Sequence, residues 1–138
     1  MGRVTTSATI TNHIDEILAE RGFISGNEVR QIILPDILVD TGTNQLCLPA
    51  DIIDRLGLPL AGTIEVKTAI GSRSLRVFRD ATLAIENREL QLTCWELPTG
   101  EDPLLGFLPL EALGLEPDLD RQRLRLLPDR GPNNYKRL

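Results

Sequence analysis

One aspartate in this sequence stands where a carboxyl group could do chemistry. Asp40 ends the apolar run of residues 37–39 and is followed at once by Thr41 and Gly42. Aspartate avoids burial unless it is paired or hydrogen-bonded, and a Thr-Gly pair after it favours a tight turn. A carboxyl held there could act as a general acid or base. Because an Asp-(Thr/Ser)-Gly triplet occurs by chance in roughly one in twenty chains of this length, its surroundings decide its meaning.

The other reactive residue types provide no competing site. Two cysteines, Cys47 and Cys94, and a single histidine, His13, are too few for a zinc site within one chain, so we expect neither a metal nor a cofactor. Both cysteines stand in apolar stretches, which predicts buried, reduced thiols in a cytoplasmic protein. No G-x-S-x-G motif accompanies His13, which argues against a serine-type or cysteine-type catalytic triad.

Composition predicts one aliphatic core. The 138 residues suit a single domain, and 41% hydrophobic with 25% charged residues is ordinary for a globular protein. A net charge of -5 argues against nucleic-acid binding, and the absence of an 18-residue apolar run argues against a membrane span. Basic residues predominate near the C-terminus. We therefore expect one domain over residues 1–127 and a basic tail over residues 128–138.

The elements predicted around Asp40 are mainly strands. Alternating apolar and polar residues predict strands at 4–10, 64–68, 75–77, 81–85, 90–94 and 123–127. The strands at 64–68 and 75–77 flank a small polar tip and are predicted to form a hairpin. Residues 28–40 are strongly apolar but contain Pro35, which predicts two strand pieces meeting at a bend.

Three short helices are predicted between the strands. One is capped by Asn12 and ends at Gly22, one covers residues 49–56, and one covers residues 109–113. The last two helices have similar flanking residues, since each begins at the proline of a Leu-Pro pair and ends at a Leu-Gly-Leu segment. Two interpretations stay open: an approximate internal two-fold repeat, or a chance recurrence of strand–turn–helix signals.

In this order, the elements resemble the single-domain, retroviral-type (retropepsin-like) aspartic proteases. The Asp-Thr-Gly loop is followed by an apolar strand and helix, then a hairpin with a glycine at its tip, then Leu-Leu-Gly and a second helix, so the resemblance covers about residues 28–127. It implies a mainly β fold, a closed, barrel-like acid-protease half with two or three short helices and a flap hairpin. Residues 13–26 would be a helical insertion. Asn44 and Phe107 replace an acidic–arginine pair of retroviral members, which indicates a bacterial-type member.

The resemblance also implies a role for each site residue. Asp40 would be the catalytic carboxyl, in a loop with Thr41, Gly42 and Thr43. The flap would consist of Ala69, Ile70, Gly71 and Ser72. The residues that support the loop would be Leu104, Leu105 and Gly106. The Thr41 hydroxyl would bond to the partner chain. Two carboxyls about 3 Å apart share one proton. Because the chain has one such triplet, we expect a homodimer in which two Asp40 side chains activate water to hydrolyse a peptide or protein substrate.

Three other interpretations fit parts of the sequence. Residues 39–44 are similar to the phosphate loop of actin-like ATPases, but the chain is too short for two large subdomains. They also resemble the phosphorylated loop of P-type ATPases, although the lysine after the aspartate is absent. A catalytically inactive, dimeric retropepsin-like module for binding or scaffolding stays open, because fold and residues do not establish turnover.

Overall fold

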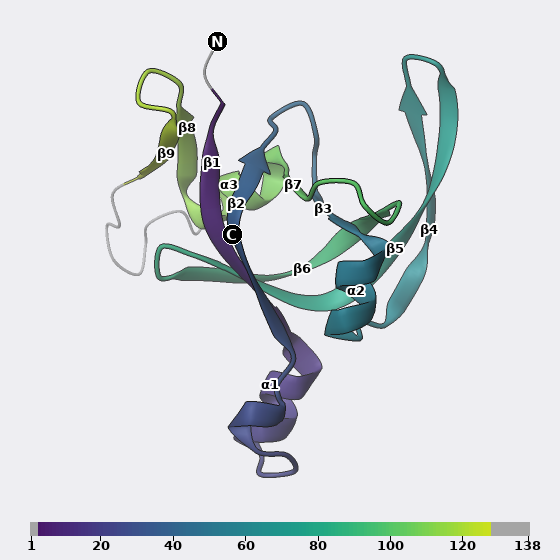
Figure 1. Cartoon of the computed structure of the whole chain (residues 1–138), viewed down its shortest axis with the longest axis vertical. Helices are drawn as coiled ribbons and strands as arrows, with labels where there is room; N and C mark the ends of the chain where they lie inside the picture. Colours follow the sequence, from purple (N-terminus) through teal and green to yellow (C-terminus); the bar gives the residue numbers. More distant parts are fainter. Residues whose placement is uncertain (1–2, 128–138) are drawn as a thin grey trace, which may run out of the picture.

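Strands make up most of the structure, a computed structural model that describes residues 3–127 (Figure 1). The elements in chain order are β1 (Thr5–Asn12), α1 (His13–Glu20), η1 (Gly26–Glu28), β2 (Gln31–Val39), β3 (Leu46–Pro49), α2 (Ala50–Leu56), β4 (Leu60–Thr68), β5 (Gly71–Ile85), β6 (Arg88–Leu97), β7 (Leu104–Leu105), α3 (Phe107–Leu113), β8 (Leu115–Asp118) and β9 (Arg123–Leu126). The predicted mainly β class with a few short helices is therefore confirmed.

The large sheet closes into a ring. Its strand order is β1-β2-β7-β3-β6-β5-β4, and an additional β1–β5 pairing joins Ile10 to Leu83. Strand β2 runs parallel to the two-residue strand β7, which pairs antiparallel with β3 on its other side. Strand β4 pairs with β5 outside the ring, and β8 and β9 form a separate hairpin. The ring is irregular, but it confirms the expected barrel-like half.

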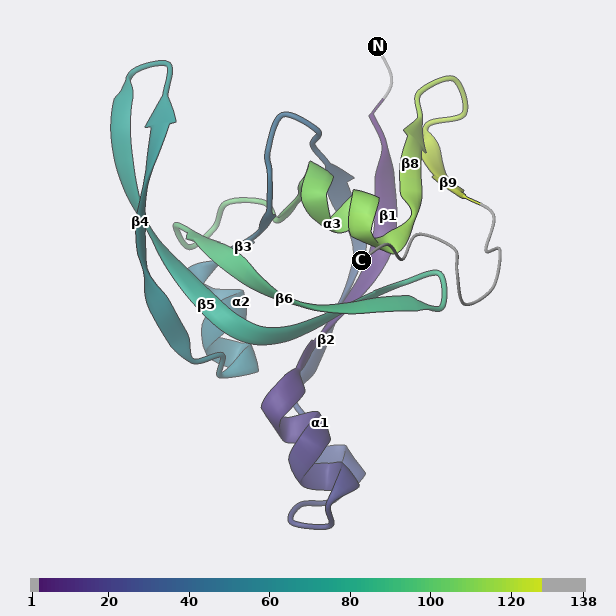
Figure 2. The ribbon, with the colours of Figure 1, turned by 180° about the vertical axis from the view of Figure 1, so that it is seen from behind.

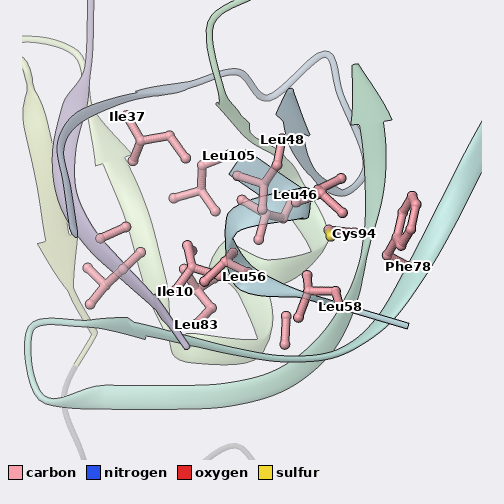
Figure 3. Close-up of a cluster of buried hydrophobic side chains, with 14 of the residues drawn as sticks. Ile10, Ile37, Leu46, Leu48, Leu56, Leu58, Phe78, Leu83, Cys94 and Leu105 are labelled. Carbon is pink, nitrogen blue, oxygen red and sulfur yellow. The ribbon is translucent and has the colours of Figure 1, made fainter. Parts of the chain in front are cut away.

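An aliphatic core fills the ring (Figure 3). Its fully buried side chains include Ile10, Ile37, Leu46, Leu48, Ile53, Leu56, Leu83, Ile85 and Leu105. Burial of each stabilises the fold by about 2 kcal/mol before the entropy of ordering it is subtracted. Both cysteines are free and buried, as predicted. Burial raises the pKa of Cys94 to about 12, so this thiol stays protonated at neutral pH.

Several strands differ in detail from the prediction. Residues 31–39 form one strand, because Pro35 and Asp36 together lie opposite Ser7 in a β-bulge. The segments 75–77 and 81–85 are one strand, β5, which bends where its register with β6 shifts and where Asp80 has a φ of 62°. Strand β8 was not predicted. The two similar helices end alike at the left-handed residues Gly57 and Gly114 but begin differently, since Pro109 lies inside α3.

A buried polar cluster attaches α1 to the ring. Asn12 accepts a hydrogen bond from the Asp15 amide at 3.0 Å and donates its side-chain N–H to the Leu56 carbonyl at 2.8 Å. The buried Asp15 carboxylate accepts from Arg30 Nε at 2.8 Å and from the Arg30 amide at 3.0 Å. The side-chain hydrogen bonds of the Arg30 guanidinium are the main reason that the pKa of Asp15 is lowered; burial acts against them, and the Arg30 amide adds a smaller lowering effect. In Figures 1 and 2 the helix extends away from the ring.

We predict that Asp15→Asn lowers the free energy of unfolding at pH 7 by about 2 kcal/mol, because it breaks a buried, charge-assisted contact. Since the pKa of Asp15 is lowered in the folded state, its stabilisation is present above the ordinary value of 3.8 and is lost as the pH falls through the lowered value. Urea unfolding at pH 7 and pH 3 should therefore show a smaller deficit at pH 3. Glu101→Gln, at the exposed Arg73–Glu101 pair, is the control and should change stability by less than about 0.5 kcal/mol.

None of the helices within residues 3–127 has the length and apolar character that a membrane crossing needs.

Candidate active site

Asp40 lies in the loop between β2 and β3 and is fixed by hydrogen bonds on two sides. Its amide donates to the Leu105 carbonyl at 2.9 Å, which continues the pairing of β2 with β7, and its carbonyl accepts from the Thr43 amide at 3.1 Å. The carboxylate Oδ1 accepts from the Gly42 amide at 3.0 Å, and Oδ2 accepts from the Thr43 hydroxyl at 3.2 Å. The half-buried carboxylate is thus held in one orientation by two donors.

The loop rests on the start of α3. The Phe107 amide donates to the Thr43 carbonyl at 2.8 Å, and the Leu108 amide donates to the Asn44 carbonyl at 3.0 Å. Helix N-terminal amides have no partner within their own helix, so these two satisfy the loop carbonyls directly. The contact needs Gly106, because a Cβ there would lie 2.4 Å from the Gln45 carbonyl oxygen and 2.6 Å from that of Thr43.

The structure therefore brings together two of the three predicted groups of site residues. Leu104 and Leu105 pair with Cys47 and Leu46 of β3, directly beneath the loop of Asp40. The third group, at the end of the β4–β5 hairpin, is Ala69, Ile70, Gly71 and Ser72. All four are exposed, and Ile70 is 99% exposed. The hairpin and the Asp40 loop extend toward the same end of the molecule in both views (Figures 1 and 2).

Three features of this site were not predicted from the sequence. Thr43 was placed in the loop of Asp40, but the hydrogen bond from its hydroxyl to the Asp40 carboxylate was not foreseen, although a hydroxyl three residues after an aspartate can reach that carboxylate. Pro117 and Leu119 follow Leu115 in a segment that was not predicted as a strand, yet they line a groove beside Thr41. Burial, with a smaller contribution from the charge of Asp40, raises the pKa of Cys47 to about 11, so this thiol is a neutral, apolar neighbour of the site.

No group of residues suited to a metal ion occurs in the described part of the chain. The chemistry that this site offers is that of the Asp40 carboxyl, which is half-buried and held in one orientation by hydrogen-bond donors. A carboxylate of this kind can take a proton from water, but a single one provides no acid to polarise a carbonyl oxygen.

A closed ring of strands that carries an Asp-Thr-Gly loop on a Leu-Leu-Gly support defines the retropepsin-like class of aspartic protease folds. The family model described as "gag-polyprotein putative aspartyl protease" matches residues 24–123, and the chain belongs to this family. The match includes the Asp40 loop, the β4–β5 hairpin and α3, and it begins after α1. A comparison with curated proteins finds no match.

Proposed function

We propose that the chain is an aspartic endopeptidase that acts as a homodimer, in which each copy contributes one Asp40 to a shared site. The observation that carries this proposal is the Asp40 carboxylate, oriented by Gly42 and Thr43 and still accessible. The sequence holds one Asp-(Thr/Ser)-Gly triplet, so the second carboxyl has to come from a second copy. Membership of the aspartyl protease family supports the same chemistry.

The proposed reaction uses the two carboxyls in different protonation states. Because the two cannot both be ionised when about 3 Å apart, one Asp40 is a carboxylate and the other a carboxylic acid. The carboxylate takes a proton from water, whose oxygen attacks the scissile carbonyl carbon, while the acid donates its proton to the carbonyl oxygen. Collapse of the tetrahedral intermediate breaks the C–N bond: the leaving nitrogen takes the proton that the first Asp40 accepted from water, and the second Asp40 takes back the proton on the former carbonyl oxygen, so the pair again carries one proton. The Gly42 amide and the Thr43 hydroxyl keep each carboxyl oriented throughout.

We propose that the substrate binds as an extended strand between the Asp40 loop and the β4–β5 hairpin, with Ala69, Ile70, Gly71 and Ser72 as the flap. The exposed side chain of Ile70 at the hairpin tip supports this assignment. The apolar side chain of Ile70 at the hairpin tip leads us to expect aliphatic or aromatic side chains on either side of the cut. A peptide-library cleavage profile tests this preference, and cuts next to charged residues would overturn it.

Casein digestion between pH 4 and 6, with and without pepstatin, tests the activity itself. We expect the dimer to cleave casein and pepstatin to block the cleavage. A dimeric wild-type chain that cleaves nothing in this range and binds no pepstatin would instead favour the binding or scaffold module.

Thr41→Val is expected to weaken the dimer without unfolding the chain. Thr41 is exposed in the single chain, and in the proposed dimer its hydroxyl bonds to the loop of the partner. Loss of both symmetry-related bonds, at about 1 kcal/mol each, should raise the dimer dissociation constant about thirtyfold. Sedimentation velocity measures this change. Thr63→Val, at an exposed position of β4, is the matched control, and equal dissociation constants for the two variants would contradict the role of Thr41.

A further inference from the structure

Two apolar grooves meet beside the Asp40 loop, and both are lined by Thr41 and Pro117. The Leu38 groove has a volume of about 230 Å³ and is also lined by Arg3, Val4, Leu38, Val39 and Leu119. The Phe107 groove has a volume of about 280 Å³ and is also lined by Phe107, Leu110, Glu111, Leu115, Glu116 and Leu127. The single chain therefore presents an apolar groove on each side of Thr41, the residue that follows Asp40.

Large apolar side chains project from the rims of these grooves. Leu119, in the turn between β8 and β9, is 65% exposed, and Phe107 is 42% exposed. Leu108, next to Phe107, is 43% exposed. Exposed apolar groups that gather around a hollow with polar edges mark an interaction surface. The β8–β9 hairpin lies on the same end of the molecule as the Asp40 loop in both views (Figures 1 and 2).

The hairpin is held rigidly at its base. The Arg88 guanidinium donates to the carbonyls of Leu113 and Gly114, at 2.9 and 3.0 Å, and to that of Leu127 at 2.7 Å. One side chain thus ties the residues before β8 to the residue after β9. A surface element that is already ordered loses little conformational entropy on association, so the turn with Leu119 is suited to contact a partner.

The position of Thr41 identifies the partner as a second copy of this chain. Any arrangement that brings a second Asp40 close to the first has to cover Thr41, and Thr41 lines both grooves. A two-fold contact is self-complementary, so a feature on one side of the axis meets the opposite feature of the partner. The grooves complement each other in charge, because Arg3 lines one and Glu111 lines the other, whereas Glu116 of the second groove is paired with Arg125 of β9.

We infer that the turn between β8 and β9 is the clasp of the homodimer: Leu119 of each copy enters the Phe107 groove of the other, and Arg3 approaches Glu111. This inference rests on the proposed dimeric function. It assigns the contact to the β8–β9 hairpin and to the Phe107 groove. The interface beside the catalytic loop would therefore be mainly apolar, as the lining of both grooves is.

Leu119→Asp tests the clasp, with Leu60→Asp, at a 52% exposed position of β4, as the matched control. We expect Leu119→Asp to raise the dimer dissociation constant at least about thirtyfold in sedimentation velocity and to lower casein cleavage at equal chain concentration. Leu60→Asp should behave as the wild type. A thermal melt of each variant checks that it folds.

Charge reversal gives a second test, in which the affinity of the dimer is restored in a double variant. Arg3→Glu and Glu111→Arg should each weaken the dimer, and the double variant should recover most of the affinity. A wild-type dimer that is active but insensitive to Leu119→Asp, with no recovery in the double variant, would overturn the clasp alone. A wild-type chain that is monomeric and inactive at tens of micromolar would overturn the proposed function, and the clasp with it.

Discussion

Replacement of Asp40 with Asn is expected to lower casein cleavage by at least about 10⁴-fold, because an amide can neither take a proton from water nor share one with its partner. The shape of the side chain is kept, so Gly42 and Thr43 can still contact it and the dimer should persist. Initial rates of casein cleavage and sedimentation velocity measure the two outcomes. Asp36→Asn, at an exposed position of the same strand, is the control and should keep full activity.

Mixing the two kinds of chain sharpens this prediction. When wild-type and Asp40→Asn chains exchange freely at a fixed total concentration, only pairs with two intact carboxyls should be active. Activity should then follow the square of the wild-type fraction. A linear dependence would mean that one Asp40 is sufficient, and it would contradict a site shared between two copies.

Gly106→Ala is expected to have the largest effect on stability. The added Cβ would lie within 2.6 Å of three backbone atoms, from Gln45 and Thr43, and backbone cannot move aside as a flexible side chain can. We expect a loss of about 3 kcal/mol or more in the free energy of unfolding, together with loss of cleavage, because the loop that orients Asp40 is displaced. Urea unfolding monitored by circular dichroism measures the first effect.

Gly26→Ala is the matched control for this substitution. A Cβ at Gly26 meets nothing within 4 Å, and its stability should stay within about 0.5 kcal/mol of the wild type. If Gly106→Ala were as stable and as active as Gly26→Ala, the contact between α3 and the Asp40 loop would not be what holds the site together.

Local sequence signals were sufficient where the structure depends on local chemistry. Gly57 ends α2 because it adopts a left-handed conformation, with φ of 64°, and Asn12 caps α1 through its own side chain. Strand β5 could not be recognised as continuous, because the two parts on either side of the bend at Asp80 are held together by pairing with β4 and β6, which are separate segments of the chain. Strand β8 contains Pro117 and forms only against β9, so its own residues gave little sign of it.

The site follows the same division. Asp40, Thr41 and Gly42 are adjacent in the chain, and their pattern was visible in the sequence. The two-residue strand β7 is too short for a periodic signal, and its place between β2 and β3 depends on sheet register. The resemblance to aspartic proteases supplied that placement. The hydroxyl bond of Thr43 and the grooves beside Thr41 became apparent only from the folded chain.

The most direct test of the account is the separation of the two Asp40 carboxyl groups in a crystal structure of the protein from solution conditions where it is dimeric. The shared-proton mechanism predicts a two-fold axis beside Asp40 and carboxyl oxygens about 3 Å apart. A dimer in which the two groups face outward, or lie too far apart to share one proton through a direct hydrogen bond, would contradict it.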